Sequence, residues 1–572
     1  MRRSLIERDK DNDNDERTLR DGDTVVNTVN LEQNNLQGTL PPDLSLLKNL
    51  VSLNLSRNKL SGTVPEEMSS MNLLEEIYLN DNNLSQKFLL DFSLMPNIAT
   101  LDLSNNQFEG NIPDSLYSIT TINQIRLDNN NFVGRIPENF GNLINLSIFT
   151  ANSNQFHGPI PVAFGSLGSL ENLSLRGNLL TGGISTELLS ATTLISLDLS
   201  NNTLAGSVPS LSMMKKLTTL SLSYNDLSGE LNFGSIRNLK EVVLEENKFS
   251  GRFPDLSELT TLNLEENLLG GNIPLSIANI SPLKEFAIHK NQLTGNIPFE
   301  ISFLRNLEKL TLSSNQFESN IPTAIGALTS LKTLTMESNF LEGQLPASLR
   351  FLSNLEVLNL ADNGFTGSIP YAIWNMASLR QLILANNNLV GQIPGSVENM
   401  KQLQVLNVGS NILRGRIPDS IVSLKNLLVL DLSFNFFGGP IPEKIGDLVD
   451  LRELLLGTNY EDSNKYFGLD GTIPVSIAAM TKLERLELNR NRFSGVLPSQ
   501  HGLLNLVQVY DVSGNRQLGG TVPANFRQMS QLNELKIVDT NIKGTIPVSL
   551  CDMGVVIEVG CSQIECNCCE CS

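Results

Sequence analysis

All six cysteines of the chain lie after residue 550. An even number of cysteines gathered at one end favours a small cap held by disulfides in an oxidising compartment. Six cysteines allow 15 pairings, and the sequence does not choose among them. A zinc site and free thiols are the alternatives, but tetrahedral zinc would need four ligands from a very short stretch of backbone. The candidate disulfide residues are Cys551, Cys561, Cys566, Cys568, Cys569 and Cys571.

The other residues that could do chemistry form no catalytic pattern. His157, His289 and His501 lie in distant parts of the chain, so no two of them can share a metal ion or a catalytic triad. The alternating aspartates of residues 9–15 resemble a calcium loop, but the Gly and Glu that such a loop needs are not in register with them. There is no glycine-rich phosphate loop. The sequence therefore predicts no enzyme and no cofactor.

The charge of the chain narrows the class of partner. Its formal net charge is -19, whereas a nucleic-acid partner would require a basic stripe. There is no apolar run of the length that a membrane helix needs, so membrane attachment would come only through a segment absent from this chain. Residues 1–23 mix both charges without a hydrophobic core, and we expect them to form a disordered tail.

A repeat of about 24 residues must position all of these side chains. The Asn of the motif Leu-x-x-Leu-x-Leu-x-x-Asn-x-Leu-x-Gly-x-Ile-Pro recurs from Asn34 and Asn58 to Asn515. A fixed period of this length is the signature of a solenoid, in which each unit packs on its neighbours. We count about 22 repeats. This predicts a solenoid over residues 24–547, followed by a Cys-rich cap over 548–572.

One repeat illustrates the role of each recurring position. Alternating leucines in residues 355–363 predict a short strand that points its leucines inward, so the residues between them face the concave side. Asn363 follows the strand, where a buried amide satisfies backbone groups, and stacked repeats then form a ladder of amides. Gly367 permits a positive φ. After Pro370 we expect a short convex helix or turn that buries Ile373, Met376 and Leu379.

The Gly-x-Ile-Pro form of the motif, as in residues 293–315, resembles the plant-type subclass of leucine-rich repeats. That subclass forms the ectodomains of receptor-like kinases and receptor-like proteins, and also the polygalacturonase-inhibitor proteins. The resemblance covers about residues 24–550, and the Cys-rich end resembles the cap of diatom- or algal-type members. It implies an α/β repeat fold: a right-handed, curved solenoid with a continuous parallel concave β-sheet, short convex helices or turns, and a second small sheet near the Gly-x-Ile-Pro segments. The family usually carries a Cys-bearing cap before its first repeat, but here the first strand follows the charged tail directly.

Apolar side chains and an insertion make repeats 16 to 19 the predicted ligand site. Four apolar residues occupy outward strand positions where polar residues are usual, and strands about 4.8 Å apart would bring them into one patch. Repeat 19 also has about eight extra residues, and long insertions often carry binding. Incidental surface apolarity is the alternative. The candidate ligand-binding residues are Ile383, Val405, Val429 and Leu455 on the strands, and Tyr460, Tyr466 and Phe467 in the insertion.

An acidic stretch lies where repeats 9 to 11 are shorter than the rest. Shorter repeats should alter the local curvature of the solenoid. The stretch is either a solvated acidic face or a site for a basic partner. Its residues are Glu241, Glu245, Glu246, Glu265 and Glu266.

The repeat and the resemblance together predict a non-catalytic recognition module. As a receptor-like ectodomain it would bind a protein, peptide or glycan ligand on its concave face, with a co-receptor as a further partner, outside the cell or at its surface. A secreted inhibitor of an extracellular enzyme and a cytoplasmic scaffold with reduced cysteines are the alternatives. N-glycosylation sequons, which matter only in a secreted chain, occur at Asn54, Asn83, Asn145, Asn172, Asn201 and Asn279.

Overall fold

The computed structural model of the chain describes residues 25–233, 236, 238–254, 258–459, 468–560, 564–566 and 568–571. The predicted tail and residues 460–467 of the insertion, with Tyr460, Tyr466 and Phe467, lie outside these ranges. The chain divides into two compact units, the first ending at Gly270 and the second beginning at Gly271. Each unit is a stack of coils of the predicted kind.

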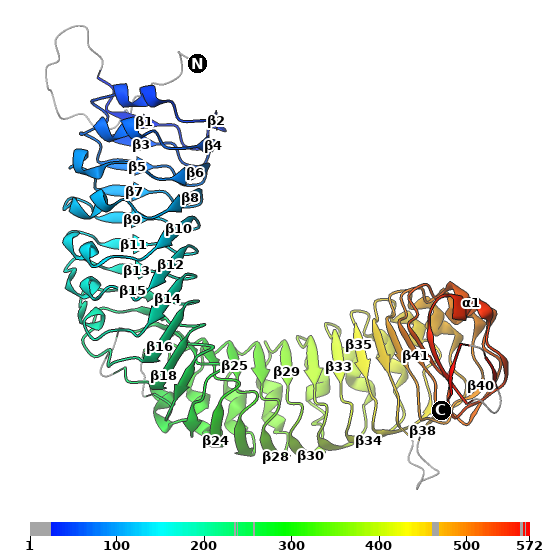
Figure 1. Ribbon diagram of the computed structural model, residues 1–572. Helices are drawn as coiled ribbons and strands as arrows, with labels where there is room; N and C mark the ends of the chain where they lie inside the picture. Colours follow the sequence, from blue (N-terminus) through cyan, green and yellow to red (C-terminus); the bar gives the residue numbers. More distant parts are fainter. Residues whose placement is uncertain are drawn as a thin grey trace. The chain divides into compact units, whose positions relative to one another are not determined.

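Each coil of the first unit contributes one short strand to a parallel sheet, and the strands pair in chain order (Figure 1). The register is uniform, because the central inward residue of one strand lies beside that of the next, as Ile77 lies beside Leu53 and Leu101. The strands are β1 (Thr28–Asn30), β3 (Ser52–Asn54), β5 (Glu76–Tyr78), β7 (Thr100–Asp102), β9 (Gln124–Arg126), β11 (Ile148–Thr150), β13 (Asn172–Ser174), β15 (Ser196–Asp198), β17 (Thr219–Ser221), β19 (Glu241–Val243) and β21 (Thr261–Asn263).

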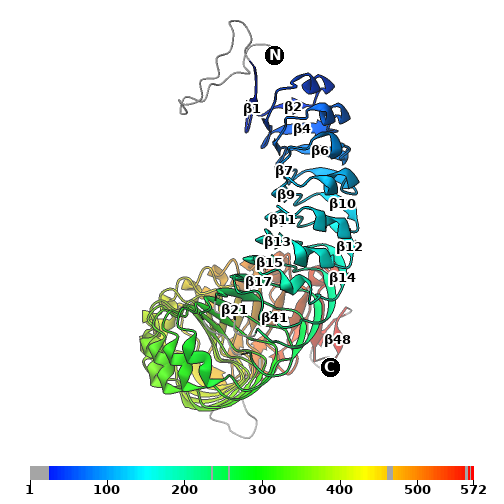
Figure 2. The same ribbon diagram turned by 90° about the vertical axis from the view of Figure 1, so that its left-hand side faces the viewer.

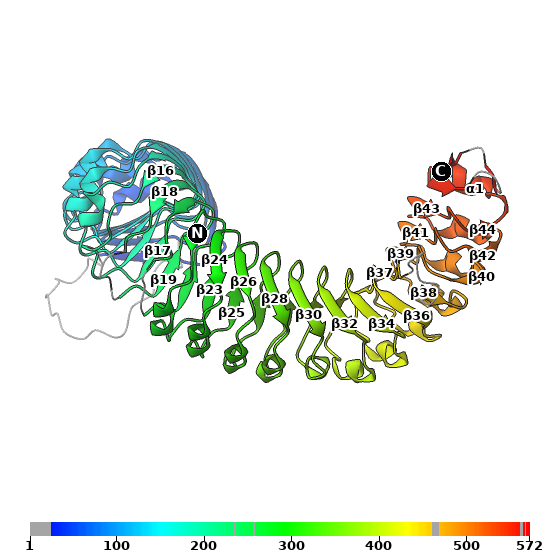
Figure 3. The ribbon, with the colours of Figure 1, turned by 90° about the horizontal axis from the view of Figure 1, so that it is seen from below.

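The second unit repeats this arrangement, with its strands along the inner side of the curve that the coils follow (Figure 3). We call the outward side of these strands, in either unit, the strand face. The strands are β23 (Glu285–Ala287), β25 (Lys309–Thr311), β27 (Thr333–Thr335), β29 (Val357–Asn359), β31 (Gln381–Ile383), β33 (Val405–Asn407), β35 (Val429–Asp431), β37 (Glu453–Leu455), β39 (Arg485–Glu487), β41 (Val509–Asp511), β43 (Glu534–Lys536), β46 (Val556–Val559) and β48 (Glu570–Cys571).

The predicted asparagine ladder holds neighbouring coils together. The Nδ2 group of Asn387 donates to the carbonyl oxygens of Leu384 and Ala385 in its own coil, at 3.2 and 3.1 Å, and to that of Leu360 in the preceding coil, at 3.0 Å. Its Oδ1 accepts the N–H of Phe365 at 3.0 Å. Because these bonds occupy the amide inside the protein, the ladder position has a structural role, as predicted.

The segments after the prolines form short 3-10 helices on the opposite side of the coils, which we call the helical-turn face. Leu349 and Leu352 show the i to i+3 pattern, since their N–H groups donate to Pro346 and Leu349 at 3.1 and 3.0 Å. In the described residues between Ala191 and Pro274, where the repeats are short, no such helix forms. The helices are η1 (Pro42–Leu46), η2 (Glu66–Ser70), η3 (Phe92–Leu94), η4 (Asp114–Ser118), η5 (Glu138–Asn142), η6 (Val162–Ser166), η7 (Leu188–Ser190), η8 (Leu275–Asn279), η9 (Phe299–Phe303), η10 (Thr323–Ala327), η11 (Ala347–Phe351), η12 (Ile373–Asn375), η13 (Gly395–Asn399), η14 (Asp419–Ser423), η15 (Ile445–Asp447), η16 (Val475–Ala479), η17 (Ser499–Leu503) and η18 (Ala524–Gln528), and one α-helix follows, α1 (Val548–Asp552).

A second set of short strands follows the other edge of the coils, as the resemblance implied (Figure 2). Gly367 adopts φ +73°, and a Cβ there would approach Gln344 Cγ to 2.9 Å, so the position requires glycine. In the first unit these strands are β2 (Gln37–Gly38), β4 (Lys59–Gly62), β6 (Asn83–Lys87), β8 (Gln107–Gly110), β10 (Asn131–Gly134), β12 (Gln155–Gly158), β14 (Leu179–Gly182), β16 (Thr203–Ser207), β18 (Asp226–Glu230) and β20 (Lys248–Ser250). From the end of the first unit onward they are β22 (Gly270–Gly271), β24 (Gln292–Asn296), β26 (Gln316–Ser319), β28 (Phe340–Gln344), β30 (Gly364–Ser368), β32 (Asn388–Gly391), β34 (Ile412–Gly415), β36 (Phe436–Pro440), β38 (Gly468–Asp470), β40 (Ser494–Val496), β42 (Gln517–Gly520), β44 (Asn541–Ile542), β45 (Gly544–Thr545) and β47 (Ile564–Glu565).

The core runs through each unit as columns of like side chains, one from each coil. Leu358 is fully buried, and Ile373, Met376 and Leu379 are buried beneath the helical-turn face, as predicted. In the first unit Phe132 stacks between Phe108 and Phe156, with ring centroids 6.1 and 6.3 Å apart. Because every core residue packs on its counterparts one coil away, outward residues are free to vary without disturbing the stack.

Candidate ligand-binding site

The structure brings two of the predicted apolar residues into direct contact range on the strand face. Val405 and Val429 are register partners on β33 and β35. Ile383 also lies on an adjacent strand, β31, but its own register partner on β33 is Asn407. All of these side chains are half-buried. The two valines therefore form a small apolar pair across β33 and β35. Ile383 lies close to this pair but belongs to a different row of register partners.

Leu455, the fourth predicted apolar residue, lies in the row of Ile383, and a half-buried carboxylate stands next to it in that row. Asp431 on β35 is the register partner of Leu455 on β37. Its carboxylate accepts bonds from the Ser433 N–H and Oγ at 3.0 and 2.6 Å. A Cβ at Gly409 would lie 3.0 Å from both carboxylate oxygens, so the glycine makes room for this side chain. Burial raises the pKa of Asp431. The predicted patch is thus two apolar parts with an acidic acceptor between them.

An aromatic residue that the sequence analysis did not select lies on the same coil as Val429. Phe434 is 57% exposed and adopts φ +52°. Its backbone N–H donates to the Gly457 carbonyl oxygen at 2.9 Å. The corresponding residues of the adjacent coils are Ser410 and Thr458, so an aromatic residue in a polar column was the signal available in the sequence. Phe434 therefore lies exposed in the turn that follows β35, one coil before the insertion.

The acidic residues of the first unit form a close group. The Asn263 amide donates to the Glu245 carboxylate. Burial is the largest cause that raises the pKa of Glu245, and its hydrogen bond to Glu265 and the repulsion between these two carboxylates raise it further. The negative charges of Glu245 and Glu246 also raise the pKa of Tyr224. The sequence analysis missed Tyr224, although its place just before a ladder asparagine puts it in the same column as Glu246.

The remaining acidic candidates are placed differently. Glu241 lies on β19 between Thr219 and Thr261, its register partners, and is exposed. Glu266 directly follows Glu265, and its carbonyl oxygen accepts the Asn247 N–H at 3.2 Å. The structure thus gathers Glu245, Glu246 and Glu265 into one group and leaves Glu241 among threonines.

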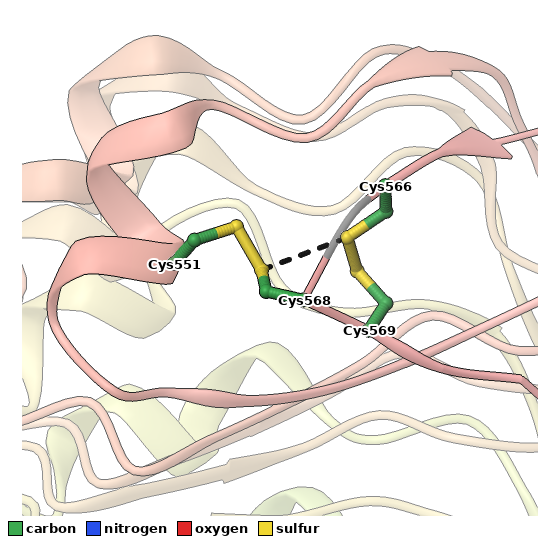
Figure 4. Close-up of a disulfide and its surroundings, with 4 residues drawn as sticks. All are labelled: Cys551, Cys566, Cys568 and Cys569. Atoms are coloured by element: carbon green, nitrogen blue, oxygen red, sulfur yellow. Dashed lines mark hydrogen bonds between the residues drawn. A yellow bond between two sulfur atoms is a disulfide. The ribbon is translucent and has the colours of Figure 1, made fainter.

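Disulfides close the end of the chain, as predicted (Figure 4). Cys551 of α1 is bonded to Cys568, and Cys566 to Cys569. The Sγ atoms of Cys566 and Cys568 are 3.7 Å apart, so the two bridges lie side by side. The sulfurs of Cys551, Cys566 and Cys568 lie within 4.8 Å of one another, but all three are in disulfides and hence are not thiolate ligands for zinc. The candidates Cys561 and the side chain of Cys571 lie outside the described part.

The histidines have separate surroundings. His157 is exposed on β12, whereas His501 is fully buried on η17. His501 Nε2 donates to the Pro474 carbonyl oxygen at 3.1 Å, and its Nδ1 accepts the Tyr510 hydroxyl at 2.9 Å. Burial lowers the pKa of His501 to about 4. This histidine is a neutral structural group, not a reactive one.

Comparisons with known proteins identify the same repeat. Two models of the leucine rich repeat match, one over residues 329–389 and the other over 49–71, 97–119, 121–143, 306–328 and 426–448. Receptor-like protein 41 of Arabidopsis thaliana is 35% identical over 101 residues, which are 16% of this chain and only 12% of that protein. In the residues that the structure describes, no helix has both the length and the apolar character to cross a membrane.

Solved structures match over much more of the chain. The Arabidopsis receptor kinase HAESA, solved with the peptide hormone IDA and the co-receptor SERK1, superposes with a TM-score of 0.84 at 30% identity. The match covers 92% of this chain and 88% of that one. The plant peptide hormone receptor RGFR1, in complex with RGF2, gives a TM-score of 0.82 at 28% identity, over 94% and 93% of the two chains.

Proposed function

Because the chain belongs to the plant-type leucine-rich-repeat receptor ectodomains, we propose that it binds a peptide on the strand face of β31 to β37. It is a non-catalytic module. The observation that supports a peptide ligand is the set of similar structures, in which HAESA and RGFR1 are each in complex with a peptide hormone. The diatom-type likeness of the Cys-rich end stays a prediction.

The surface around Val405 and Val429 suits an extended peptide. The two valines form an apolar pair across neighbouring strands. Phe434 provides an exposed aromatic anchor on the same coil as Val429. Asp431, held by Ser433 between the apolar parts, gives an acceptor for a peptide N–H group. Apolar side chains of the peptide would set the affinity, and the half-buried acceptor would set its register.

We place the protein outside the cell or at its surface. Disulfides persist in oxidising compartments, and the described residues at the end of this chain include two of them. A co-receptor is a further partner in this proposal, by analogy with the complex of HAESA and SERK1.

The test uses peptides that the source organism secretes, captured on the immobilised full chain and identified by mass spectrometry. Synthetic copies of the retained peptides are then titrated against Val429→Asp, which places a second carboxylate beside Asp431. We expect about a tenfold or greater loss of affinity, as for the loss of an interface anchor. The matched variant is Glu245→Ala/Glu265→Ala, which alters the strand face of the other unit and should bind normally. Loss of binding only in that variant would place the ligand on the acidic group and refute the proposal.

A further inference from the structure

The helical-turn face of the second unit carries a group of large exposed side chains. Two columns point outward there: the residue after each proline and the last residue of each 3-10 helix. On η10 these positions hold the small residues Thr323 and Ala327. On the other helices from η8 to η12, five of these positions hold large side chains that are more than half exposed: Leu275, Phe299, Phe303, Phe351 and Tyr371. The remaining three hold Asn279, Ala347 and Asn375.

Most of these side chains are aromatic, and they lie on both sides of η10, which has no large side chain at these positions. Phe299 and Phe303 make an edge-to-face pair on η9, with ring centroids 6.1 Å apart. Phe351 ends η11, and Tyr371 precedes η12. The helices from η8 to η12 each neighbour the next. A monomer that needed no partner here would gain nothing from exposing aromatic rings over several coils.

A cation lies among these rings. The guanidinium group of Arg350 stacks over the Phe351 ring, 4.6 Å from its centroid. No ion pair within the described ranges includes Arg350, whereas Lys332 and Arg380 bind Glu308 and Glu356 at 2.6 and 3.1 Å. A stacked guanidinium keeps its N–H edge open, so it is preorganised to bind a carboxylate.

A hollow separates the two aromatic residues nearest to this cation. It has a volume of about 660 Å³ and is lined by Arg350, Phe351, Tyr371, Asn375 and Met376, with small residues between them. A second hollow is lined by the prolines of three coils, Pro322, Pro346 and Pro370. Hollows of this size admit a few side chains of a partner. Tyr371, which lines the first hollow and directly follows Pro370 of the second, is 67% exposed.

We propose that the helical-turn face of η8 to η12 docks a partner protein through a segment with an acidic residue beside a large apolar one. The apolar side chain would enter the hollow between Phe351 and Tyr371, and the carboxylate would bind Arg350. Charge favours this occupant: the chain has a net charge of -19, and Arg350 is a cation outside the ion pairs of the described residues, so a carboxylate is attracted at this position.

The ring geometry favours a protein segment over an acidic sugar polymer. A sugar stacks on an open ring face, but Arg350 covers one face of Phe351, and Phe299 and Phe303 pack against each other. Tyr371 is the ring of this group that no other ring or cation in the described residues covers. A row of apolar anchors with few cations matches a protein interface, where aromatic residues dominate the binding energy.

The test is a selection from a random peptide library displayed on mRNA. The library is selected in parallel on the full chain and on its Phe351→Ser/Tyr371→Ser variant. We expect peptides retained only by the wild type to carry Asp or Glu next to Trp, Phe or Leu. Their affinity should fall about tenfold or more in the double variant. A peptide that binds the strand face is retained by both proteins, so failure of the proposed function does not affect this result.

Two further variants complete the design. Phe340→Ser removes a ring that is also 67% exposed but lies on β28, outside the hollow, and should leave the affinity within about twofold. Arg350→Glu should shift the selected peptides from acidic to basic. The proposal is overturned if the same peptides are enriched on both proteins, or if Arg350→Glu leaves their charge unchanged. It is equally overturned if the face binds a uronate polymer instead, or if sedimentation shows self-association through Phe351 and Tyr371.

Discussion

The buried contact between His501 and Tyr510 makes the second unit sensitive to acid. Both ring nitrogens of His501 are used: Nε2 donates to Pro474, and Nδ1 accepts from Tyr510. Protonation would put a hydrogen on Nδ1, so the tyrosine hydroxyl would have to turn and accept, and a charge would lie in the core. Replacing the ring by the neutral amide in His501→Gln keeps a donor and an acceptor but removes the titration.

The size of the effect follows from the pKa. Burial lowers the pKa of His501 from 6.5 to about 4 in the folded chain. The unfolded chain therefore binds a proton near pH 6.5, while the folded chain does not bind it until about pH 4. Stability from the neutral ring is fully present above pH 6.5 and is lost as the pH falls toward 4. At about 1.4 kcal/mol per pH unit, the loss amounts to about 3 kcal/mol.

The measurement is denaturant unfolding of the wild type and His501→Gln at pH 7 and pH 4, with hydrogen exchange to locate the change. Comparing the two proteins cancels the contribution of the carboxylates that titrate in the same pH range. These include Asp511, because burial raises the pKa of Asp511. We expect the wild type to lose about 3 kcal/mol more than the variant, with faster exchange on β41 and η17. His157→Gln, which removes an exposed histidine, should keep the full acid-induced loss. An equal loss in the wild type and His501→Gln would refute the reasoning.

Three further predictions concern other parts of the chain. Leu358→Ala empties a fully buried strand position and should cost about 2–5 kcal/mol, with hydrogen exchange rising mainly in neighbouring coils and not uniformly. Removing the Cys551–Cys568 bridge by changing both residues to serine should cost about 2–4 kcal/mol, and thermal unfolding with peptide-level exchange should show α1 opening first. Glu245→Gln should slow hydrogen exchange on β19 and β21 at pH 7 but not at pH 4. The pKa of Glu245 is raised in the folded chain, so its ionisation lowers the stability as the pH rises, whereas the side-chain amide of the glutamine is not repelled by Glu265.

The repeat allowed most of the fold to be predicted, because its inward positions obey one physical rule in every coil. The burial of Leu358, the bonding of the ladder asparagines and the positive φ of Gly367 all follow from a period that the sequence repeats many times. The prediction left open whether the segments after the prolines form helices or turns. They are short 3-10 helices with i to i+3 bonds, except for the last, α1, which is an α-helix. The outward residue Ala361 is buried.

The candidate site was harder to predict, because outward positions obey no repeated rule. Four apolar residues at outward strand positions suggested one patch. In the structure, however, the strand register pairs only Val405 with Val429, and it pairs Asp431 with Leu455. Whether two side chains are neighbours depends on which of the outward columns each one occupies, and this became clear only from the pairing of the strands. Phe434 and Tyr224 were overlooked, although both directly precede a ladder asparagine, in the column that also holds Glu246 and Glu266.

The two faces of each coil are free to evolve separately, and this makes two binding surfaces on one chain physically reasonable. The inward residues of a coil pack on the coils before and after it, so a change at an outward strand position does not propagate to the helical turn of the same coil. Val429 and Phe434 on one face and Phe351 and Tyr371 on the other lie on different coils as well as on different sides. A ligand on the strand face and a partner on the helical-turn face would therefore neither compete for the same residues nor disturb each other's contacts. Any coupling between them would have to pass through a change in the stacking of the coils, which the bonded asparagine ladder resists.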